Sequence, residues 1–311
     1  MTDKTVPLDD YSFYANVFSY MGLPLSRDLD DNSVDAVIMG VPYDLATSGR
    51  AGTRSGPQAM RQVSANMVWE EKRWPWDFAL SEKLKAIDFG DVQYMFGDSD
   101  DMLKQTEEQA AAITAAGKTL ISFGGDHFVT LPLLRGHART HGKLALIHFD
   151  AHTDSYQEEE KYSHGCMFYH APREGLIDPA RSVQVGIRTH YDRPTHEFQV
   201  IDAHQANEQS VQDTVTAIRE RVGDHPAYLT FDIDCLDPAY APGTGTPVVG
   251  GLSTSRVMRI LQGIADLNIV GFDVVEVSPA YDHADITALA GASLALQFLY
   301  MRASRVKEAV K

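Results

Sequence analysis

Three short, largely apolar runs in this chain are each followed directly by acidic or imidazole side chains, and this pattern restricts the possible folds strongly. The runs cover residues 120–123, 144–149 and 227–231. Their length and composition are typical of strands that are buried on both faces. Ligands of open α/β sheets bind beyond the carboxyl ends of the strands, so we expect the polar residues after these runs to share one site.

The polar residues after the three runs are of the types that bind metal ions. Asp150, His152 and Asp154 stand at alternate positions, so an extended backbone would aim all three the same way. The complete candidate set is His127, Asp150, His152, Asp154, Asp232 and Asp234. These carboxylates and imidazoles outnumber what one divalent ion can use while water also binds, so the set predicts two ions per chain. Oxygen-rich sites with some imidazole favour Mn²⁺, while Ni²⁺, Co²⁺ and Fe²⁺ remain alternatives.

A surface carboxylate or a helix cap is the ordinary alternative for any one of these acids. Four carboxylates close together would be costly to bury without cations, because of desolvation and like-charge repulsion. The set as a whole therefore favours metal binding. His148 lies on the same face as Asp150 and is interpreted as a buried packing residue, with a role behind the metal left open. The remaining histidines are interpreted as surface or packing residues: His137, His141, His170, His190, His196, His204, His225 and His283.

Apolar runs and helical patterns alternate along the rest of the chain. Further strands are expected at 34–40, 86–89, 182–187, 198–201 and 268–274. Helices are expected at 101–116, 130–140, 210–222, 255–265 and 285–302. About eight strands alternating with helices predict an α/β fold with a mostly parallel sheet covered on both faces. No linker or repeat interrupts the pattern, so we expect a single domain over residues 1–311, with residues 1–33 as an N-terminal arm on the body or on a neighbouring subunit.

Net charge and cysteine content narrow the functional classes. A formal net charge of −16 argues against nucleic acid and anionic membranes as partners and mildly favours cationic ligands, although solubility alone explains it. Cys166 and Cys235 are too few for a disulfide framework and are interpreted as reduced packing thiols rather than nucleophiles. Acidic residues stand where a signal peptide would be apolar, and no uninterrupted apolar run approaches a membrane span, so we expect a cytoplasmic protein.

Three motifs, taken in order, resemble those of the ureohydrolases, the family that includes arginases and agmatinases. They read GGDH at 124–127, FDAHTD at 149–154 and FDIDCLDPAYAPGTGTP at 231–247. The likeness extends over nearly the whole chain, including GVPYDLATSGRAGTRSGPQAMRQ at 40–62. It implies a three-layer α/β/α fold, a binuclear metal centre and assembly into trimers or hexamers. It also places the glycine-rich loop 47–56 beside the metals as an active-site wall, for which a phosphate-binding loop is the alternative.

The resemblance distributes the candidate ligands over two ions. The first ion would be held by His127, Asp150, Asp154 and Asp232. The second would be held by Asp150, His152, Asp232 and Asp234, so that Asp150 and Asp232 bridge the pair. A guanidinium carbon is a poor electrophile because its charge is delocalised, and a hydroxide held between the two cations would be a strong enough nucleophile to attack it.

Further catalytic assignments follow from the same resemblance. His164 matches the proton-shuttle histidine, which would protonate the leaving amine. Asp154 is a further candidate for handling the proton of the hydroxide. Glu276 matches the carboxylate that pairs with the planar guanidinium, with a structural salt bridge as the alternative. Asp126 and Asp273 are candidates for orienting ligands or loops, and the sequence does not decide between these roles.

The expected substrate is a small cationic guanidino compound, agmatine, which would be cleaved to putrescine and urea. Arginases grip an α-carboxylate with Asn and Ser residues that are not recognisable in the corresponding loop, 155–163. Glu158 to Glu160 would instead favour a distal ammonium, or form a solvated loop tip. Arginine, guanidinobutyrate and formiminoglutamate are the alternative substrates. A non-catalytic homologue is the alternative from another class, but it would be expected to lack a ligand or the shuttle histidine, and none is missing.

Overall fold

One parallel sheet organises the molecule. The computed structural model describes residues 18–157 and 162–306. Within these ranges the strands follow the order β2-β1-β3-β8-β7-β4-β5-β6, and all neighbouring strands are parallel. Their bounds are β1 Ala36–Val41, β2 Ala86–Asp91, β3 Thr119–Gly124, β4 Ala145–Phe149, β5 Val183–Val185, β6 Gln199–Ile201, β7 Ala227–Asp232 and β8 Ile269–Val275. The strand predictions are therefore confirmed.

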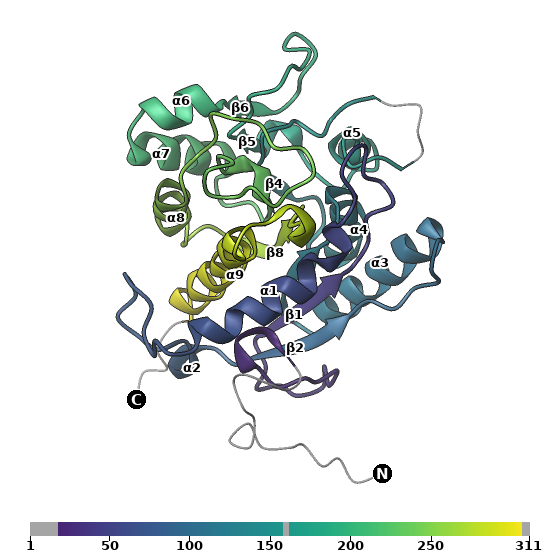
Figure 1. Ribbon diagram of the computed structural model, residues 1–311, viewed down its shortest axis with the longest axis vertical. Helices are drawn as coiled ribbons and strands as arrows, with labels where there is room; N and C mark the ends of the chain where they lie inside the picture. The colour runs from purple at the N-terminus through teal and green to yellow at the C-terminus, as the bar shows by residue number, and fades with distance from the viewer. Residues whose placement is uncertain (1–17, 158–161, 307–311) are drawn as a thin grey trace.

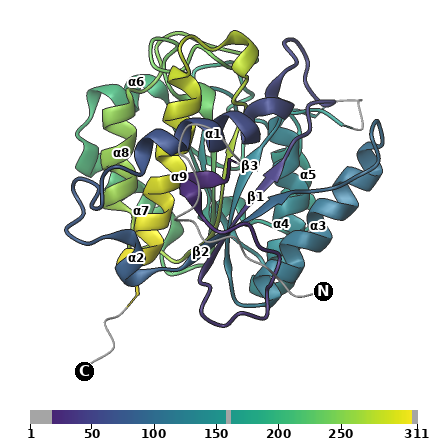
Figure 2. The same cartoon turned by 60° about the horizontal axis from the view of Figure 1, so that its bottom comes forward.

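Helices cover both faces of the sheet. Their bounds are α1 Gly56–Ser64, α2 Leu80–Lys83, α3 Ser99–Ala115, α4 Thr130–His141, α5 Met167–Arg173, α6 Ala203–Glu208, α7 Val211–Val222, α8 Thr254–Gly263 and α9 Ile286–Ser304. Figure 2 shows α3, α4 and α5 on one side of the strands and α1, α7, α8 and α9 on the other. Each side has its own cluster of buried apolar side chains. The predicted three-layer α/β/α architecture is confirmed.

The helix ends follow local sequence signals. The Asp98 side chain accepts a hydrogen bond from the Asp101 N–H and so caps the start of α3. Ser210 and Asp213 form a reciprocal capping box at the start of α7, and Gly223, with a φ of 58°, follows its last residue as the C-cap. The helix ranges expected from the sequence do not include α1, α2, α5 and α6, which have 9, 4, 7 and 6 residues. Helices this short gain their stability from packing rather than from their own sequence.

Helix α9 is apolar on all sides. It is the one helix among residues 18–157 and 162–306 whose length and composition would allow it to cross a membrane, but 78% of the qualifying stretch is buried inside the protein. It packs against α1, α8 and β8. A helix that is surrounded by protein has no polar face to maintain, which explains its composition.

Residues 18–33 lie against the body of the protein. Tyr20 is fully buried, and its hydroxyl donates to the Ala292 carbonyl of α9 at 2.8 Å. The Tyr20 N–H donates to Asp88 of β2, which also accepts two hydrogen bonds from Arg61. This part of the predicted arm therefore packs on the body, where Figure 1 shows it as the dark purple segment beside β2. Residues 1–17 lie outside the described residues, so the complete arm and the single domain stay predictions.

The register of the central strands brings polar residues to one edge of the sheet. Phe149 at the end of β4 pairs with Phe231 of β7, and Asp232 at the end of β7 pairs with Val275 of β8. The residues that follow these strands therefore emerge at the same level. Strand β3 lies on the other side of β8, so the loop after it joins the same group.

Candidate metal centre and active site

His127 is the centre of the first half of the predicted site. It follows β3 and is fully buried. Its Nδ1 lies 3.1 Å from Asp150 Oδ2 and 2.8 Å from Asp154 Oδ2. The same nitrogen lies 3.3 Å from Asp232 Oδ2. Asp154 has a φ of 48°. Residues other than glycine rarely adopt this backbone conformation, and those that do are concentrated at functional sites. The structure thus brings together the four residues predicted for one ion.

His152 is the centre of the second half. Its Nδ1 lies 3.4 Å from Asp150 Oδ1 and 3.1 Å from Asp234 Oδ2. Asp150 therefore faces His127 with one carboxylate oxygen and His152 with the other, as a bridging ligand would. Asp232, which is also expected to bridge, lies within 3.3 Å of His127 Nδ1 and accepts a hydrogen bond from the Asp234 N–H.

The spacing of these atoms fits ligands of shared cations. Groups held about 2.1 Å from one ion at right angles to each other stand about 3 Å apart. The nitrogen-to-oxygen distances around His127 and His152 lie between 2.8 and 3.4 Å. Although three carboxylates surround it, the buried His127 Nδ1 makes no directed hydrogen bond within the described chain. A lone pair aimed among carboxylate oxygens is the arrangement that a divalent cation requires.

The buried carboxylates of the cluster are also electrostatically unfavourable without cations. Burial and the charge of Asp150 raise the pKa of Asp154 to about 7. Burial, together with the charges of Asp234 and Asp150, raises the pKa of Asp232 well above its usual range. Each shift means that the ionised carboxylate is destabilised by its surroundings. Divalent ions among these groups would relieve both the repulsion and the desolvation.

A hydrogen-bonded network determines which nitrogen of His127 faces the carboxylates. His127 Nε2 lies 2.9 Å from Thr230 Oγ1, which donates its proton to Asp273 Oδ1. Thr230 must then accept from His127, so the Nε2 of His127 carries a proton, and in the neutral ring Nδ1 is the nitrogen that can bind a cation. Tyr228 and Thr130 also donate to Asp273. Asp273, whose role the sequence left open, therefore supports a predicted ligand.

The interpretation of His148 and His196 as packing or surface residues was incomplete. His148 is fully buried, but its Nε2 also lies 2.7 Å from Asp150 Oδ2. Burial lowers the pKa of His148 to about 4, so the ring is neutral at neutral pH. His196 is half-buried and hydrogen-bonds Gln184, which in turn hydrogen-bonds His148. The register of β4 and β5, which places His148 opposite Gln184, is the signal that would have revealed this contact.

Glu276 and His164 lie next to each other beside the cluster. Glu276 follows β8 with a φ of 63°, and its Oε1 accepts a hydrogen bond from the His127 N–H at 2.8 Å. His164 Nδ1 lies 2.9 Å from the same oxygen. Burial would lower the pKa of His164, but its hydrogen bond to Glu276 and the charge of that carboxylate raise it to about 9. Glu276 Oε2 is buried and has no hydrogen-bond partner in the described chain.

The glycine-rich loop borders this pair, as its interpretation as an active-site wall requires. Ser48 Oγ lies 2.8 Å from His164 Nε2. The Ala46 N–H donates to Asp126 Oδ2, and the Ala46 carbonyl accepts from the His164 N–H. Asp44 holds the loop closed by accepting from the Gly52 N–H at 2.8 Å. Asp126, the second residue left open by the sequence, is thus a loop anchor.

The two cysteines are both buried, and neither is in a disulfide. Burial raises the pKa of the Cys235 thiol well above its usual range, so the thiol is protonated at neutral pH. A protonated, inaccessible thiol is a poor nucleophile. The interpretation of Cys235 as a packing thiol agrees with this environment.

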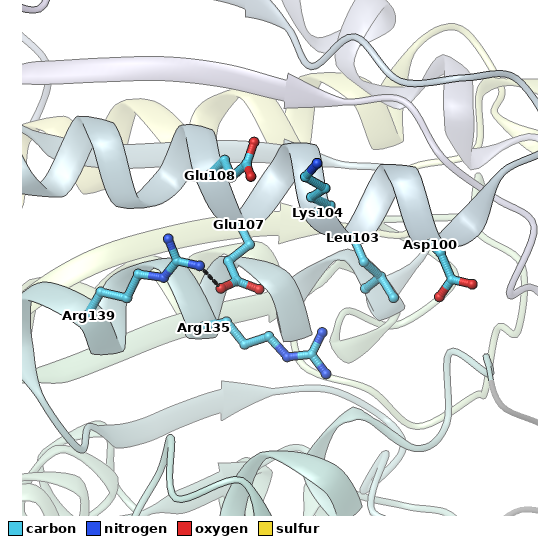
Figure 3. A pocket seen from close by; sticks show the side chains of 7 residues that line it. All are labelled: Asp100, Leu103, Lys104, Glu107, Glu108, Arg135 and Arg139. Atoms are coloured by element: carbon cyan, nitrogen blue, oxygen red, sulfur yellow. Dashed lines mark hydrogen bonds and ion pairs between the residues drawn. The ribbon is translucent and has the colours of Figure 1, made fainter.

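A hollow between α3 and α4 lies apart from this cluster (Figure 3). It is lined by Asp100, Leu103, Lys104, Glu107, Glu108, Arg135 and Arg139. Arg139 pairs with Glu107, and Arg135 makes two hydrogen bonds to Glu174. Both guanidinium groups are therefore already engaged by carboxylates, so the hollow shows no built anion site.

The predicted substrate-tail contacts fall on a part of the chain that is not described. Glu158, Glu159 and Glu160 lie outside the described residues, and their preference for a distal ammonium stays a prediction. On the near side of that gap, Tyr156 donates to the His190 carbonyl at 3.1 Å. Tyr156 therefore lies against the segment that follows β5.

Comparison with known proteins gives matches over nearly the whole chain. A family model described as the arginase family matches residues 34–301. An agmatinase of Photorhabdus laumondii subsp. laumondii is 57% identical over 296 residues, which are 95% of this chain and 96% of that protein. A crystal structure described as a hypothetical agmatinase from Burkholderia thailandensis has a TM-score of 0.90 and 45% identity, covering 94% of this chain and 93% of its own. The proclavaminate amidino hydrolase of Streptomyces clavuligerus has a TM-score of 0.87 and 38% identity, covering 94% and 99%.

Proposed function

The chain belongs to the arginase family, and from that premise we propose that it is an agmatinase, which hydrolyses agmatine to putrescine and urea at a binuclear metal centre. The observation that carries the proposal is the buried cluster around His127 and His152, in a chain 57% identical to a curated agmatinase. A homologue that binds without catalysis would be expected to have lost a metal ligand or the shuttle histidine. This chain has all six proposed ligands and His164.

We propose that two divalent ions, Mn²⁺ in the first place, occupy the cluster. The proposed ligands are His127, Asp150, His152, Asp154, Asp232 and Asp234. When bound, two such ions lower the pKa of a shared water and supply a strong nucleophile at neutral pH. The donor set of carboxylate oxygen and imidazole nitrogen supports Mn²⁺, and it also suits Ni²⁺, Co²⁺ and Fe²⁺.

Glu276 is the proposed partner of the substrate guanidinium. Its Oε1 is held by the His127 N–H, while its buried Oε2 has no hydrogen-bond partner in the described chain. A Cβ at Gly245 would lie 3.5 Å from Oε2, so the glycine leaves space beside this oxygen. A carboxylate in such a buried position can bind the planar donors of a guanidinium by charge-assisted hydrogen bonds.

His164 is the proposed general acid. Its pKa of about 9 favours the protonated ring at neutral pH, and the Nδ1 proton is directed at Glu276. The hydrogen bond to Glu276 places the ring beside the proposed guanidinium site, so that it can protonate the leaving amine. Asp154, which is raised to a pKa of about 7 by burial and by the charge of Asp150, is a second group able to exchange a proton near neutral pH.

The enzyme is further proposed to act in the cytoplasm as a homo-oligomer, a trimer or a hexamer, and to contribute putrescine to polyamine synthesis. The family resemblance supports the assembly, and the acidic balance of the chain suits a cationic substrate. Light scattering of the purified protein measures the assembly directly. A monomer at working concentration would contradict this part of the proposal.

A substrate panel with urea detection tests the assignment. We expect kcat/KM for agmatine to be well above the values for arginine and 4-guanidinobutyrate, because those substrates bring a carboxylate toward a loop that carries Glu158, Glu159 and Glu160. Part of the preference must come from lost carboxylate contacts, since a solvated ion pair contributes only about 0 to 1 kcal/mol. Equal efficiency with arginine or 4-guanidinobutyrate would overturn the substrate assignment and leave the metal chemistry standing.

A further inference from the structure

A chain of hydrogen-bonded side chains runs from Asp150, the proposed bridging carboxylate, toward the surface. His148 Nε2 lies 2.7 Å from Asp150 Oδ2, and the Gln184 amide nitrogen lies 2.9 Å from His148 Nδ1. His196 Nε2 lies 2.7 Å from Gln184 Oε1. His148 and Gln184 are fully buried, and His196 is half-buried. We propose that His148, Gln184 and His196 form a relay that positions Asp150 between the two halves of the metal centre.

The direction of each hydrogen bond follows from the donors that are present. Gln184 donates one amide proton to the Thr153 carbonyl at 2.7 Å and the other to His148 Nδ1. A reversed amide would set its oxygen against the Thr153 carbonyl, so only this orientation is allowed. His148 Nδ1 is then an acceptor and carries no proton. Its Nε2 must carry the proton and donate it to Asp150.

The outer end of the relay is fixed in the same way. Gln184 Oε1 can only accept, so His196 donates from Nε2. The His196 ring packs between Tyr191 and Phe198, with centroid distances of 4.8 and 5.4 Å. Its Nδ1 faces Ser155 Oγ at 3.5 Å. The orientation of the Gln184 amide therefore determines which ring nitrogen of His148 accepts a hydrogen bond and which ring nitrogen of His196 donates one.

The relay braces the segment that carries three proposed ligands. It contacts residues 150–155 at the Asp150 carboxylate, at the Thr153 carbonyl and at Ser155. The donated proton of His148 holds Asp150 Oδ2, which faces His127, while Oδ1 is held by the His152 N–H at 2.6 Å. Each oxygen thereby keeps a lone pair directed toward its own half of the centre. Groups that orient metal ligands in this way typically change metal affinity by about 10- to 100-fold when they are removed.

The inference rests on the proposed metal centre, and Mn²⁺ binding by the full chain tests it. Gln184→Met keeps the approximate shape of the side chain and removes its hydrogen bonds to His148, to His196 and to the Thr153 carbonyl. We expect it to raise the Kd for Mn²⁺, measured by calorimetric titration of metal-stripped protein, by about 10- to 100-fold. His148→Phe should raise the Kd at least as much. His196→Phe removes only the outer contacts, with Gln184 and Ser155, and should raise the Kd by a smaller factor.

A matched control separates positioning from structural support. Gln297 in α9 is also buried and accepts a hydrogen bond from Trp76. Gln297→Met should lower the Tm of the metal-stripped protein and leave the Kd unchanged. Wild-type Kd values in the relay variants, with or without a lower Tm, would overturn the relay. An unaltered protein that binds neither Mn²⁺ nor Ni²⁺, Co²⁺ or Fe²⁺ would instead overturn the proposed metal centre.

Discussion

His164 is the residue whose replacement separates proton transfer from metal binding. Its ring contacts Glu276 and Ser48 rather than the proposed ligands. We expect His164→Asn to keep both ions and to lower kcat by about 10²- to 10⁴-fold, which is the usual contribution of a general acid. Elemental analysis alongside the kinetics gives the two quantities. An unchanged kcat with both ions bound would remove His164 from the mechanism.

The pKa of His164 also sets the expected alkaline limit of the reaction. Burial opposes the charged ring, but Glu276 raises the pKa of His164 to about 9, so the acid form is present at neutral pH and is lost as the pH rises through that value. We expect kcat/KM to fall above a pH of about 9. A profile of unaltered enzyme against His164→Asn checks the source. Persistence of the same alkaline limb in the variant would assign it to another group.

Thr230 acts on the metal centre through His127 alone. Thr230→Val removes the oxygen that accepts from His127 Nε2, and we expect a weaker affinity for Mn²⁺ by about 10- to 100-fold. Thr230→Ser retains the hydroxyl and should restore most of the affinity. Tyr228→Phe removes a different donor to Asp273 and should change the Kd less. Similar Kd values for the Val and Ser variants would contradict the role of the hydroxyl.

The roles of some of these residues could be predicted from the sequence and those of others could not, for a physical reason. Asp150, His152 and Asp154 are close in sequence and directly follow β4, so their presence in one site can be predicted, whereas the expected extended backbone ends before Asp154, whose φ is 48°. The contact between His148 and Gln184 depends on β4 and β5 being neighbours, and no local pattern reports which strands are adjacent. Roles that act across the sheet therefore become visible only in the fold.

Among the elements, the attachment of residues 18–33 to β2 depends on Asp88. This buried carboxylate binds Arg61, whose side chain is 8% exposed, and caps the Tyr20 N–H. Asp88→Ala should lower the free energy of unfolding by about 3 kcal/mol, because it leaves a buried guanidinium without its main partner. Urea denaturation measures the change, which should leave Mn²⁺ affinity intact.

An exposed pair provides the comparison for that change. Arg219 and Asp266 form an ion pair in which both side chains are more than 40% exposed, at 42% and 64%. Asp266→Ala should cost at most about 1 kcal/mol, because solvent screens such pairs. Equal losses in the two variants would show that the burial of Asp88 does not determine its contribution.

Strands could be predicted more completely than helices in this chain. The strands are continuous apolar runs because both faces of the sheet are covered, and such runs stand out in the sequence. Helices α2, α5 and α6 have too few turns for a periodic pattern to emerge. Long helices such as α3 were recognised because both their apolar stripe and their caps are present.

At the scale of the whole molecule, the prediction is that metal loading and folding stability change together. The purified protein should bind two divalent ions per chain, and saturating Mn²⁺ at 100 times its Kd should stabilise the fold by about 2.7 kcal/mol for each independent site. Elemental analysis and thermal unfolding with and without Mn²⁺ measure both effects. Asp150→Ala should lower metal content and activity together. One ion per chain at full activity would contradict the binuclear centre.

The strand order also determines when the sheet can close during synthesis. Strand β8 lies between β3 and β7, although it is the last strand in the chain. Until residues 269–275 have left the ribosome, β3 and β7 each present an unpaired edge, and the two halves of the sheet have no strand between them. The nascent chain can therefore hold two open half-sheets between the emergence of β7 at residues 227–232 and that of β8. Protection from aggregation during that interval must come from chaperones or from the ribosome, because the native fold cannot yet provide it.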